Sequence, residues 1–262
     1  MAKPFEKFFQ PRSQPEISIS EEDGIRYLHF GSVWIQGAMR IRDPFHLELG
    51  YTRELFAGLL FHSDPRNIVL LGLGAGSASK FAWKACPKAK VTSVELNPAV
   101  IGVAHSQFEL PPDSKRMRTV CGDAQAFITA PATRADYLIV DVYDAAAKGP
   151  VLSSPEFYAS CRAALSEGEL GVMAVNLFGR HKSYETNLRN IDKAFDGRLL
   201  VLPPSERGNV IAFGLAGAPL EIKLAELRSR AARLKESTGL EFNRWVGAFR
   251  SANQLEGNTW SV

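Results

Sequence analysis

Two carboxylates, Asp141 and Asp144, end an apolar run that begins at Tyr137 and is suited to a buried strand. Buried carboxylates are costly unless a partner compensates their charge. The pair therefore either caps the following turn and faces solvent, or holds a cation. A cationic amine would fit, because one carboxylate can accept its proton as the nitrogen attacks carbon. A simple alkylamine has a pKa of about 10 and is protonated at neutral pH, so such chemistry requires a base.

A glycine-rich turn, with Gly72, Gly74 and Gly76, lies between a predicted strand and a predicted helix. Glycine allows a sharp turn and close approach of a ligand, and the helix offers free amide groups at its N-terminus. Alone, such a turn is equally typical of a tight strand-to-helix connection. Glu95 ends the next strand, 23 residues after Gly72, near the offset of ~20 residues at which a carboxylate binds ribose hydroxyls. The combination favours a nucleoside ligand.

Two classes of nucleoside cofactor compete for this turn. A nicotinamide dinucleotide prefers the spacing G-x-G-x-x-G, which cradles a pyrophosphate, whereas a sulfonium nucleoside carries no phosphate. The residue three after Gly74 is Ser77, so the spacing here is G-x-G-x-G. We therefore favour the sulfonium nucleoside.

Asp123 and Ala124 follow a third predicted strand. Parallel α/β sheets bind ligands at the carboxyl ends of their strands, so Asp123 and the neighbouring backbone amides could recognise an adenine amino group. Asp123 also suits the N-cap of the helix that begins near Ala124, which is compatible with binding. Asp141 and Asp144 end a fourth strand at the same edge, where a bound sulfonium would place its reactive carbon.

Strands and helices alternate through most of the chain. Continuously apolar strands separated by helix-length segments predict a parallel sheet covered on both faces. Residues 198–217 depart from this pattern, because two strands meet there through a Pro and Gly turn, which predicts an antiparallel edge pair. The expected strands are 67–74, 90–96, 116–123, 135–144 and 169–178, and the expected helices are 77–86, 98–108 and 154–165.

The N-terminal part reads differently. Apolar and polar residues alternate on both sides of an Asp-Gly turn in 16–30, which predicts a hairpin, and 32–41 reads as a further strand. A helix is expected over 45–62, where apolar residues recur every four positions. These are Leu47, Tyr51, Leu55 and Leu59. A boundary at Ser63 to Asn67 divides the chain into domains 1–63 and 64–262.

Composition limits the class of protein. The chain has 262 residues, 45% of them apolar, and a formal net charge of +3, so neither disorder nor nucleic-acid binding is indicated. Three widely spaced cysteines predict free thiols and a cytoplasmic protein. No stretch of about 18 apolar residues suggests a membrane span. The five histidines lack the spacing of a zinc site, so no metal is expected.

Several segments together resemble the spermidine and spermine synthases. The likeness covers nearly the whole chain, in the segments IQGAM, YTRELF, LLGLGAGS, VELNP, GDAQ, DYLIVDVYD and SPEFYASCRAAL. It implies a Rossmann-like, S-adenosylmethionine-dependent methyltransferase fold, with a mostly parallel seven-stranded sheet, an antiparallel edge strand and a small N-terminal β-rich domain. It also implies a homodimer. Members transfer an aminopropyl group from decarboxylated S-adenosylmethionine to putrescine or a similar amine, and methylthioadenosine leaves.

The resemblance also implies roles for individual residues. Asp141 matches the catalytic aspartate that deprotonates the amine, and Asp144 its acidic neighbour in the amine pocket. Glu95 and Asp123 match the ribose and adenine ligands. Two further residues have equally good structural explanations. Tyr51 matches a tyrosine that closes the site but would also suit a helix core, and Gln36 matches a glutamine near the nucleoside but would also suit an ordinary strand position.

Some positions differ from the family pattern. Ala75 replaces the glycine-loop aspartate that binds the donor's amino group and repels a donor carboxylate. Thr52 and Arg53 replace His or Gln and Glu after the tyrosine, with Glu48 as a substitute acid one helical turn earlier. Ala145 and Asn176 replace a proline and a glutamine. Two alternatives therefore stay open, namely a methyltransferase that uses intact S-adenosylmethionine and a nucleoside-binding relative without catalysis.

Overall fold

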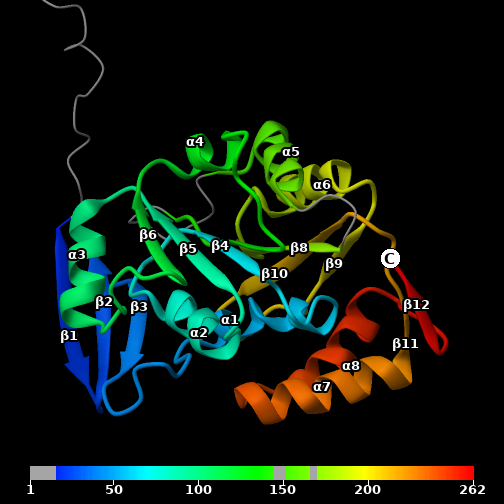
Figure 1. The fold of residues 1–262 in the computed structure, drawn as a ribbon, viewed down its shortest axis with the longest axis horizontal. Coiled ribbons are helices and arrows are strands. Elements are labelled where there is room, and N and C mark those ends of the chain that lie inside the picture. The colour runs from blue at the N-terminus through cyan, green and yellow to red at the C-terminus, as the bar shows by residue number, and fades with distance from the viewer. Residues whose placement is uncertain (1–15, 144–151, 166–169) are drawn as a thin grey trace, which may run out of the picture.

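A seven-stranded sheet forms the centre of the molecule (Figure 1). The computed structural model describes residues 16–143, 152–165 and 170–262. Five adjacent strands pair in parallel, while β10 runs antiparallel to both β8 and β9. This confirms the expected parallel sheet with an antiparallel edge pair. In spatial order the strands are β6 (Met117–Cys121), β5 (Lys90–Glu95), β4 (Asn67–Leu71), β7 (Tyr137–Val140), β8 (Gly171–Phe178), β10 (Asn209–Ala216) and β9 (Leu199–Val201).

Helices cover both faces of this sheet (Figure 1). Side chains of β4 alternate between the two cores, with Leu70 in one and Leu71 in the other, and both are buried. This two-sided burial explains the continuously apolar strands. None of the helices in the described ranges is long and apolar enough to cross a membrane. One face carries α2 (Ser77–Ala85), α7 (Leu224–Thr238) and α8 (Phe242–Ala252), the other carries α4 (Ala124–Thr129), α5 (Pro155–Ala164) and α6 (Tyr184–Ala194), and α3 (Pro98–Gln107) packs on β5 and β6.

A separate three-stranded antiparallel sheet precedes the central one. It contains β1 (Ile17–Glu22), β2 (Ile25–Phe30) and β3 (Ile35–Arg40), which confirms the predicted hairpin and third strand. Gly37 of β3 lies so close to the glycine loop that a Cβ atom there would be 2.5 Å from the Cβ of Ala75. The small sheet is therefore packed directly against the loop. The domain division at residue 63 stays a prediction.

The helix expected over 45–62 is broken into two short pieces, α1 (Gly50–Glu54) and the 3₁₀ helix η1 (Ala57–Leu60), so that prediction was wrong. A continuous α-helix would use the carbonyl of Leu55 to accept from the amide four residues later. Instead, that carbonyl accepts a hydrogen bond of 2.7 Å from the hydroxyl of Tyr137 in β7. Tertiary packing on the sheet therefore overrides the four-residue apolar repeat.

At the C-terminal end, β11 (Glu221–Lys223) pairs with β12 (Thr259–Ser261) as a two-stranded ribbon.

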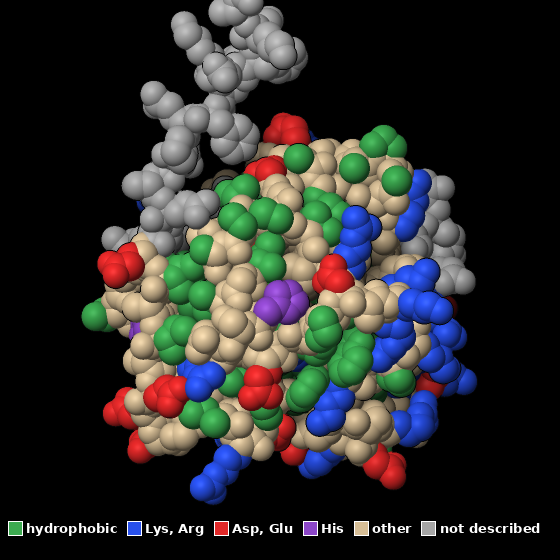
Figure 2. Space-filling model, turned by 60° about the vertical axis from the view of Figure 1, so that its left-hand side comes forward, with side chains coloured by type: hydrophobic (Ala, Val, Ile, Leu, Met, Phe, Trp, Pro, Cys, Tyr) green, Lys and Arg blue, Asp and Glu red, His purple; other side chains and the backbone are tan. Residues whose placement is uncertain are grey.

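Charge is unevenly distributed on the surface despite the small net charge. Figure 2 shows Lys and Arg side chains gathered on the right-hand side of the face drawn, whereas Asp and Glu side chains are scattered over it.

Gly58 tests the contact between η1 and the sheet. A Cβ atom at this position would lie 2.6 Å from the Tyr137 hydroxyl and 2.8 Å from Val172. We expect Gly58→Ala to lower the free energy of unfolding by about 1–3 kcal/mol through overpacking, as measured by urea titration. Gly102→Ala in α3 is the control, because nothing lies within 4 Å of its Cβ position. It should raise stability by up to about 1 kcal/mol, and equal effects of the two substitutions would contradict this account.

Candidate active site

A cleft of about 1810 Å³ opens at the carboxyl ends of the central strands. β4 pairs with β5 on one side and with β7 on the other. The order in which successive strands are added to the sheet therefore reverses at β4. Such a switch point is where open α/β sheets bind ligands. β3, α1, α8 and the β9–β10 turn complete the walls. Eight residues predicted from sequence line it, namely Gln36, Tyr51, Gly72, Gly74, Glu95, Asp123, Ala124 and Asp141.

The glycine loop needs its glycines for geometric reasons. Gly72 has a φ of 95°, and a Cβ atom there would lie 2.2 Å from the carbonyl oxygen of Asp141. Gly74 has a φ of 53° and approaches the Gln36 carbonyl in the same way, at 3.0 Å. Gly76, with a φ of 70°, precedes α2 but does not line the cleft, so it shapes the turn. The loop is thus packed against both β3 and the end of β7.

Glu95 lies at the end of β5 with its carboxylate beside the glycine loop. One oxygen, Oε2, accepts from the Leu73 amide at 3.3 Å, and Oε1 accepts from the Asn97 amide at 2.9 Å. Burial raises the pKa of Glu95, and these backbone hydrogen bonds partly offset the increase. The carboxylate is therefore held in place at the position where the sequence predicts a ribose contact.

Asp123 caps α4, as the sequence suggested. Its Oδ1 atom accepts from the Ala126 amide at 2.8 Å, which satisfies one free amide at the start of the helix. Ala124, the first residue of α4, is buried and lines the cleft beside it. The cap is confirmed, whereas recognition of adenine by this residue stays a prediction.

Asp141 directly follows β7, which ends at Val140 rather than at the expected residue 144. Its Oδ1 atom accepts from the Asn176 side-chain amide at 2.9 Å. The hydroxyl of Tyr51 in α1 donates a second hydrogen bond to the carboxylate. The Asn176 amide is itself oriented, because its oxygen accepts from the Asn209 side chain at 3.0 Å. Two neutral donors from different elements thus position this carboxylate.

The electrostatics of Asp141 suit a base. Although part of the residue faces the cleft, burial raises the pKa of its carboxyl, while the bonds from Asn176 and Tyr51 lower it again in part. Burial, aided by the Asp141 charge, raises the pKa of Tyr51 well above its usual value, so Tyr51 stays a donor. Among the described residues, no ion pair includes Asp141. Its charge is therefore available to a ligand.

Asp144 lies outside the described residues, so its place beside Asp141 stays a prediction. Within the described ranges, no group of three or more His, Cys, Asp or Glu side chains could hold a metal ion. Tyr143 lines the cleft, and its hydroxyl donates to the Asn176 carbonyl at 2.9 Å.

Comparisons with known proteins identify the family of this chain. No family model matches the chain. A polyamine aminopropyltransferase of Chromobacterium violaceum is 34% identical over 253 residues, which cover 96% of each chain. Another of Neisseria meningitidis is 32% identical and covers 93% of this chain and 92% of its own. The chain belongs to the polyamine aminopropyltransferase family.

Solved structures with lower identity show the same fold. A probable spermidine synthase of Corynebacterium glutamicum superposes with a TM-score of 0.67 at 19% identity, covering 89% of this chain and 91% of its own. A spermidine synthase in complex with the transition-state analogue AdoDATO gives 0.58 at 20% identity, covering 76% and 73%. These matches confirm the spermidine synthase-like α/β fold that the sequence resemblance implies.

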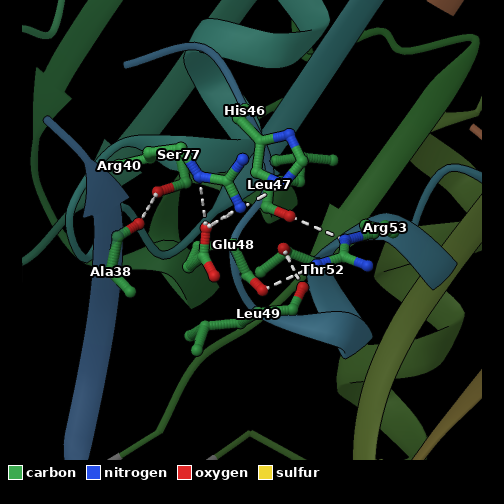
Figure 3. A network of polar contacts seen from close by, with 9 residues as sticks. All are labelled: Ala38, Arg40, His46, Leu47, Glu48, Leu49, Thr52, Arg53 and Ser77. Carbon is green, nitrogen blue, oxygen red and sulfur yellow. Dashed lines mark hydrogen bonds and ion pairs between the residues drawn. The ribbon is translucent and has the colours of Figure 1, made fainter. Parts of the chain in front are cut away.

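The segment around α1 that departs from the family pattern, residues 48–53, is tightly held (Figure 3). Glu48 precedes α1, so the expectation that it lies one turn earlier on the same helix was wrong. Arg40 binds its carboxylate, with Nη2 at 3.0 Å, and Glu48 does not line the cleft. Thr52 is buried and donates to the Leu49 carbonyl at 2.6 Å. Neither residue supplies a carboxylate to a ligand.

Several side chains that line the cleft were not predicted from the sequence, and Glu54, Asn209 and Arg244 are among them. Glu54 could have been found, because it follows Tyr51 by three residues and so shares its helix face. Asn209 and Arg244 carry no local signal. They come from β10 and α8, far along the chain, and only the fold brings them to the cleft.

The hydrogen bonds to Asp141 predict how the activity of this protein depends on pH. The predicted base, Asp141, must be deprotonated to accept a proton, so we expect activity to fall as pH drops through its pKa. Tyr51→Phe removes a bond that lowers this pKa. The acidic limb of kcat/KM should therefore move to higher pH. Asn176→Ala should move it further, since its bond lowers the pKa more.

Tyr143→Phe is the control for this measurement, because its hydroxyl bonds the Asn176 backbone rather than Asp141. Its acidic limb should coincide with that of the wild type. A limb that stays in place in both Tyr51→Phe and Asn176→Ala would show that Asp141 does not control it.

Proposed function

We propose that this protein transfers an aminopropyl group from decarboxylated S-adenosylmethionine to a small primary amine, of which putrescine is the simplest candidate. The observation that most directly supports this proposal is the position of the Asp141 carboxylate at the switch point. Asn176 and Tyr51 hold it there, and it pairs with no described cation. The names of the relatives that match over most of the chain support the proposal.

In this reaction the amine nitrogen attacks the carbon that is bonded to the sulfonium sulfur. A carbon–nitrogen bond forms, the carbon–sulfur bond breaks with its electron pair going to sulfur, and methylthioadenosine leaves. Asp141 accepts the proton that the nitrogen loses. Tyr51 and Asn176 keep the carboxylate oriented toward the cleft, and Asp144 is its predicted partner in holding the cationic acceptor.

The adenosyl part of the donor lies over the ends of β4, β5 and β6. Glu95 binds the ribose hydroxyls and Asp123 the adenine amino group, with Gln36 near the nucleoside. Trp34 and Leu96 also line the cleft and are 58% and 65% exposed. They offer apolar surface to the faces of the base. The cytoplasmic location and the homodimer expected from sequence stay predictions.

A methyltransferase is the second candidate, and Ala75 favours it. An alanine at this position removes the negative charge that would repel the carboxylate of intact S-adenosylmethionine. The two reactions differ in the nucleoside they release, because methyl transfer leaves S-adenosylhomocysteine and aminopropyl transfer leaves methylthioadenosine. A relative without catalysis would release neither nucleoside.

Asp141→Asn tests the proposed base directly. With decarboxylated S-adenosylmethionine and putrescine, the wild type should release methylthioadenosine, as measured by chromatography. The variant should lose about 10²–10⁴-fold in kcat, the usual contribution of a positioned base. Its affinity for methylthioadenosine should be unchanged in titration calorimetry, which serves as the folding control. Full activity in the variant, or release of S-adenosylhomocysteine by the wild type when intact S-adenosylmethionine replaces the decarboxylated donor, would overturn the proposal.

A further inference from the structure

Three charged side chains gather in the wall of the cleft and take no part in proton transfer at Asp141. Arg53 and Glu54 are neighbours in α1, and Arg244 projects from α8. Glu54 follows Tyr51 by three residues, so the two side chains emerge from the same side of the helix, one turn apart. Because the Tyr51 hydroxyl bonds Asp141, the cluster lies about one helical turn along α1 from the residue that touches the base.

Glu54 has a carboxylate oxygen that no described residue satisfies. Its Oε2 atom is buried and has no hydrogen-bond partner in the described part of the chain. Burial raises the pKa of Glu54, and the charges of Arg244 and Arg53 oppose that rise. An unsatisfied buried oxygen is unfavourable, and a ligand group that donates to it, such as an ammonium, would offset that cost.

Arg53 presents a guanidinium that is already fixed in place (Figure 3). Its Nε atom donates to the Leu47 carbonyl at 2.7 Å, and Nη2 donates to the Glu48 carbonyl at 2.8 Å. Neither Arg53 nor Arg244 forms an ion pair with any carboxylate among the described residues. A guanidinium held by neutral carbonyls keeps its full charge and its remaining donors, which match a carboxylate in geometry.

The two ends of this part of the cleft therefore differ in charge. Asp141 has only neutral hydrogen-bond partners, which suits an amine that must lose a proton. At the other end, Glu54 lies within the fields of two guanidinium groups. A ligand ending in an ammonium alone matches Glu54 but approaches two positive charges. A ligand whose ammonium lies next to a carboxylate matches all three side chains.

We propose that Arg53, Glu54 and Arg244 form a subsite for an α-amino-acid head group, with its ammonium on Glu54 and its carboxylate on the two arginines. The proposal rests on the proposed function for the chemistry at Asp141 and narrows its substrates. The head group has two possible sources. It belongs either to the acceptor, as in an α,ω-diamino acid, or to the methionyl end of intact S-adenosylmethionine, which Ala75 does not repel. Either source leaves the bond changes at nitrogen, carbon and sulfur as described above, and with intact S-adenosylmethionine the group transferred is 3-amino-3-carboxypropyl instead of aminopropyl.

Titration calorimetry with matched pairs of ligands separates the two sources. In the acceptor arm, ornithine is compared with putrescine, and lysine with cadaverine, by titrating each into protein saturated with methylthioadenosine. In the donor arm, intact S-adenosylmethionine is compared with its decarboxylated form by titrating each into free protein. In one of these arms the carboxylated member should bind about tenfold to a hundredfold more tightly, the usual worth of a charged hydrogen-bonded contact. Equal or weaker binding of the carboxylated member in every pair would overturn the subsite.

Arg244→Gln locates the preference. Arg244 is exposed on α8, so the variant should fold, and it should lose most of the preference for the carboxylated ligand. Arg250→Gln is the matched control, because Arg250 is an exposed arginine of the same helix that does not line this cleft. It should retain the preference. Glu54→Gln should weaken ligands with and without the carboxylate alike, since both carry the ammonium. A preference that survives in Arg244→Gln would also overturn the proposal.

The outcomes distinguish this subsite from the proposed function. Release of methylthioadenosine with putrescine, together with no preference for carboxylated ligands, would keep the function and remove the subsite. A preference that depends on Arg244, with no methylthioadenosine released from any pair of donor and amine, would keep the subsite and remove the function.

Discussion

The close approach of Gly72 to Asp141 is the contact on which the site depends. No side chain fits at position 72, because its first carbon would lie 2.2 Å from the Asp141 carbonyl oxygen. The absence of that carbon lets the end of β4 and the end of β7 meet at the switch point of the sheet. The glycine loop and Asp141, the proposed base, are thereby placed beside one another by the packing of their backbones.

Holding a carboxylate at this position has an energetic cost, and neutral groups offset it. Asn176 and Tyr51 donate to Asp141 from β8 and α1, and Asn209 orients the amide of Asn176. A cation in their place would stabilise the carboxylate more, but it would also lower its pKa and occupy the position of a cationic amine. Neutral donors keep the group oriented while leaving its charge for the ligand and its pKa raised.

The departures of this chain from its family pattern are connected in space. Arg53 is held by the backbone of the segment that precedes α1, and Arg40 holds Glu48 in that same segment. The position that usually carries an acid thus carries a fixed guanidinium, and the remaining acid of α1, Glu54, is one residue further along. Since successive residues of a helix point about 100° apart, this change moves the negative charge around the helix as well as along it.

Much of this arrangement could be predicted from the sequence. The order of strands and helices, the antiparallel edge pair, the N-terminal hairpin and the cap at Asp123 follow from local patterns of apolar residues, glycines and capping side chains. The same patterns placed Gly72, Glu95 and Asp141 at one edge of the sheet, because the carboxyl ends of parallel strands always meet there.

Only the tertiary structure decided the rest. The break between α1 and η1 arises because the Tyr137 hydroxyl takes the Leu55 carbonyl, an interaction across 82 positions that no local repeat reveals. The pairing of Arg40 with Glu48, and the electrostatic influence of Arg244 on Glu54, likewise depend on how separate elements pack. The sequence by itself determined which elements form and which carboxylates end the strands, since those depend on neighbours in the chain. Which charges face one another across the cleft was decided by folding, because electrostatic energy depends on distance in space.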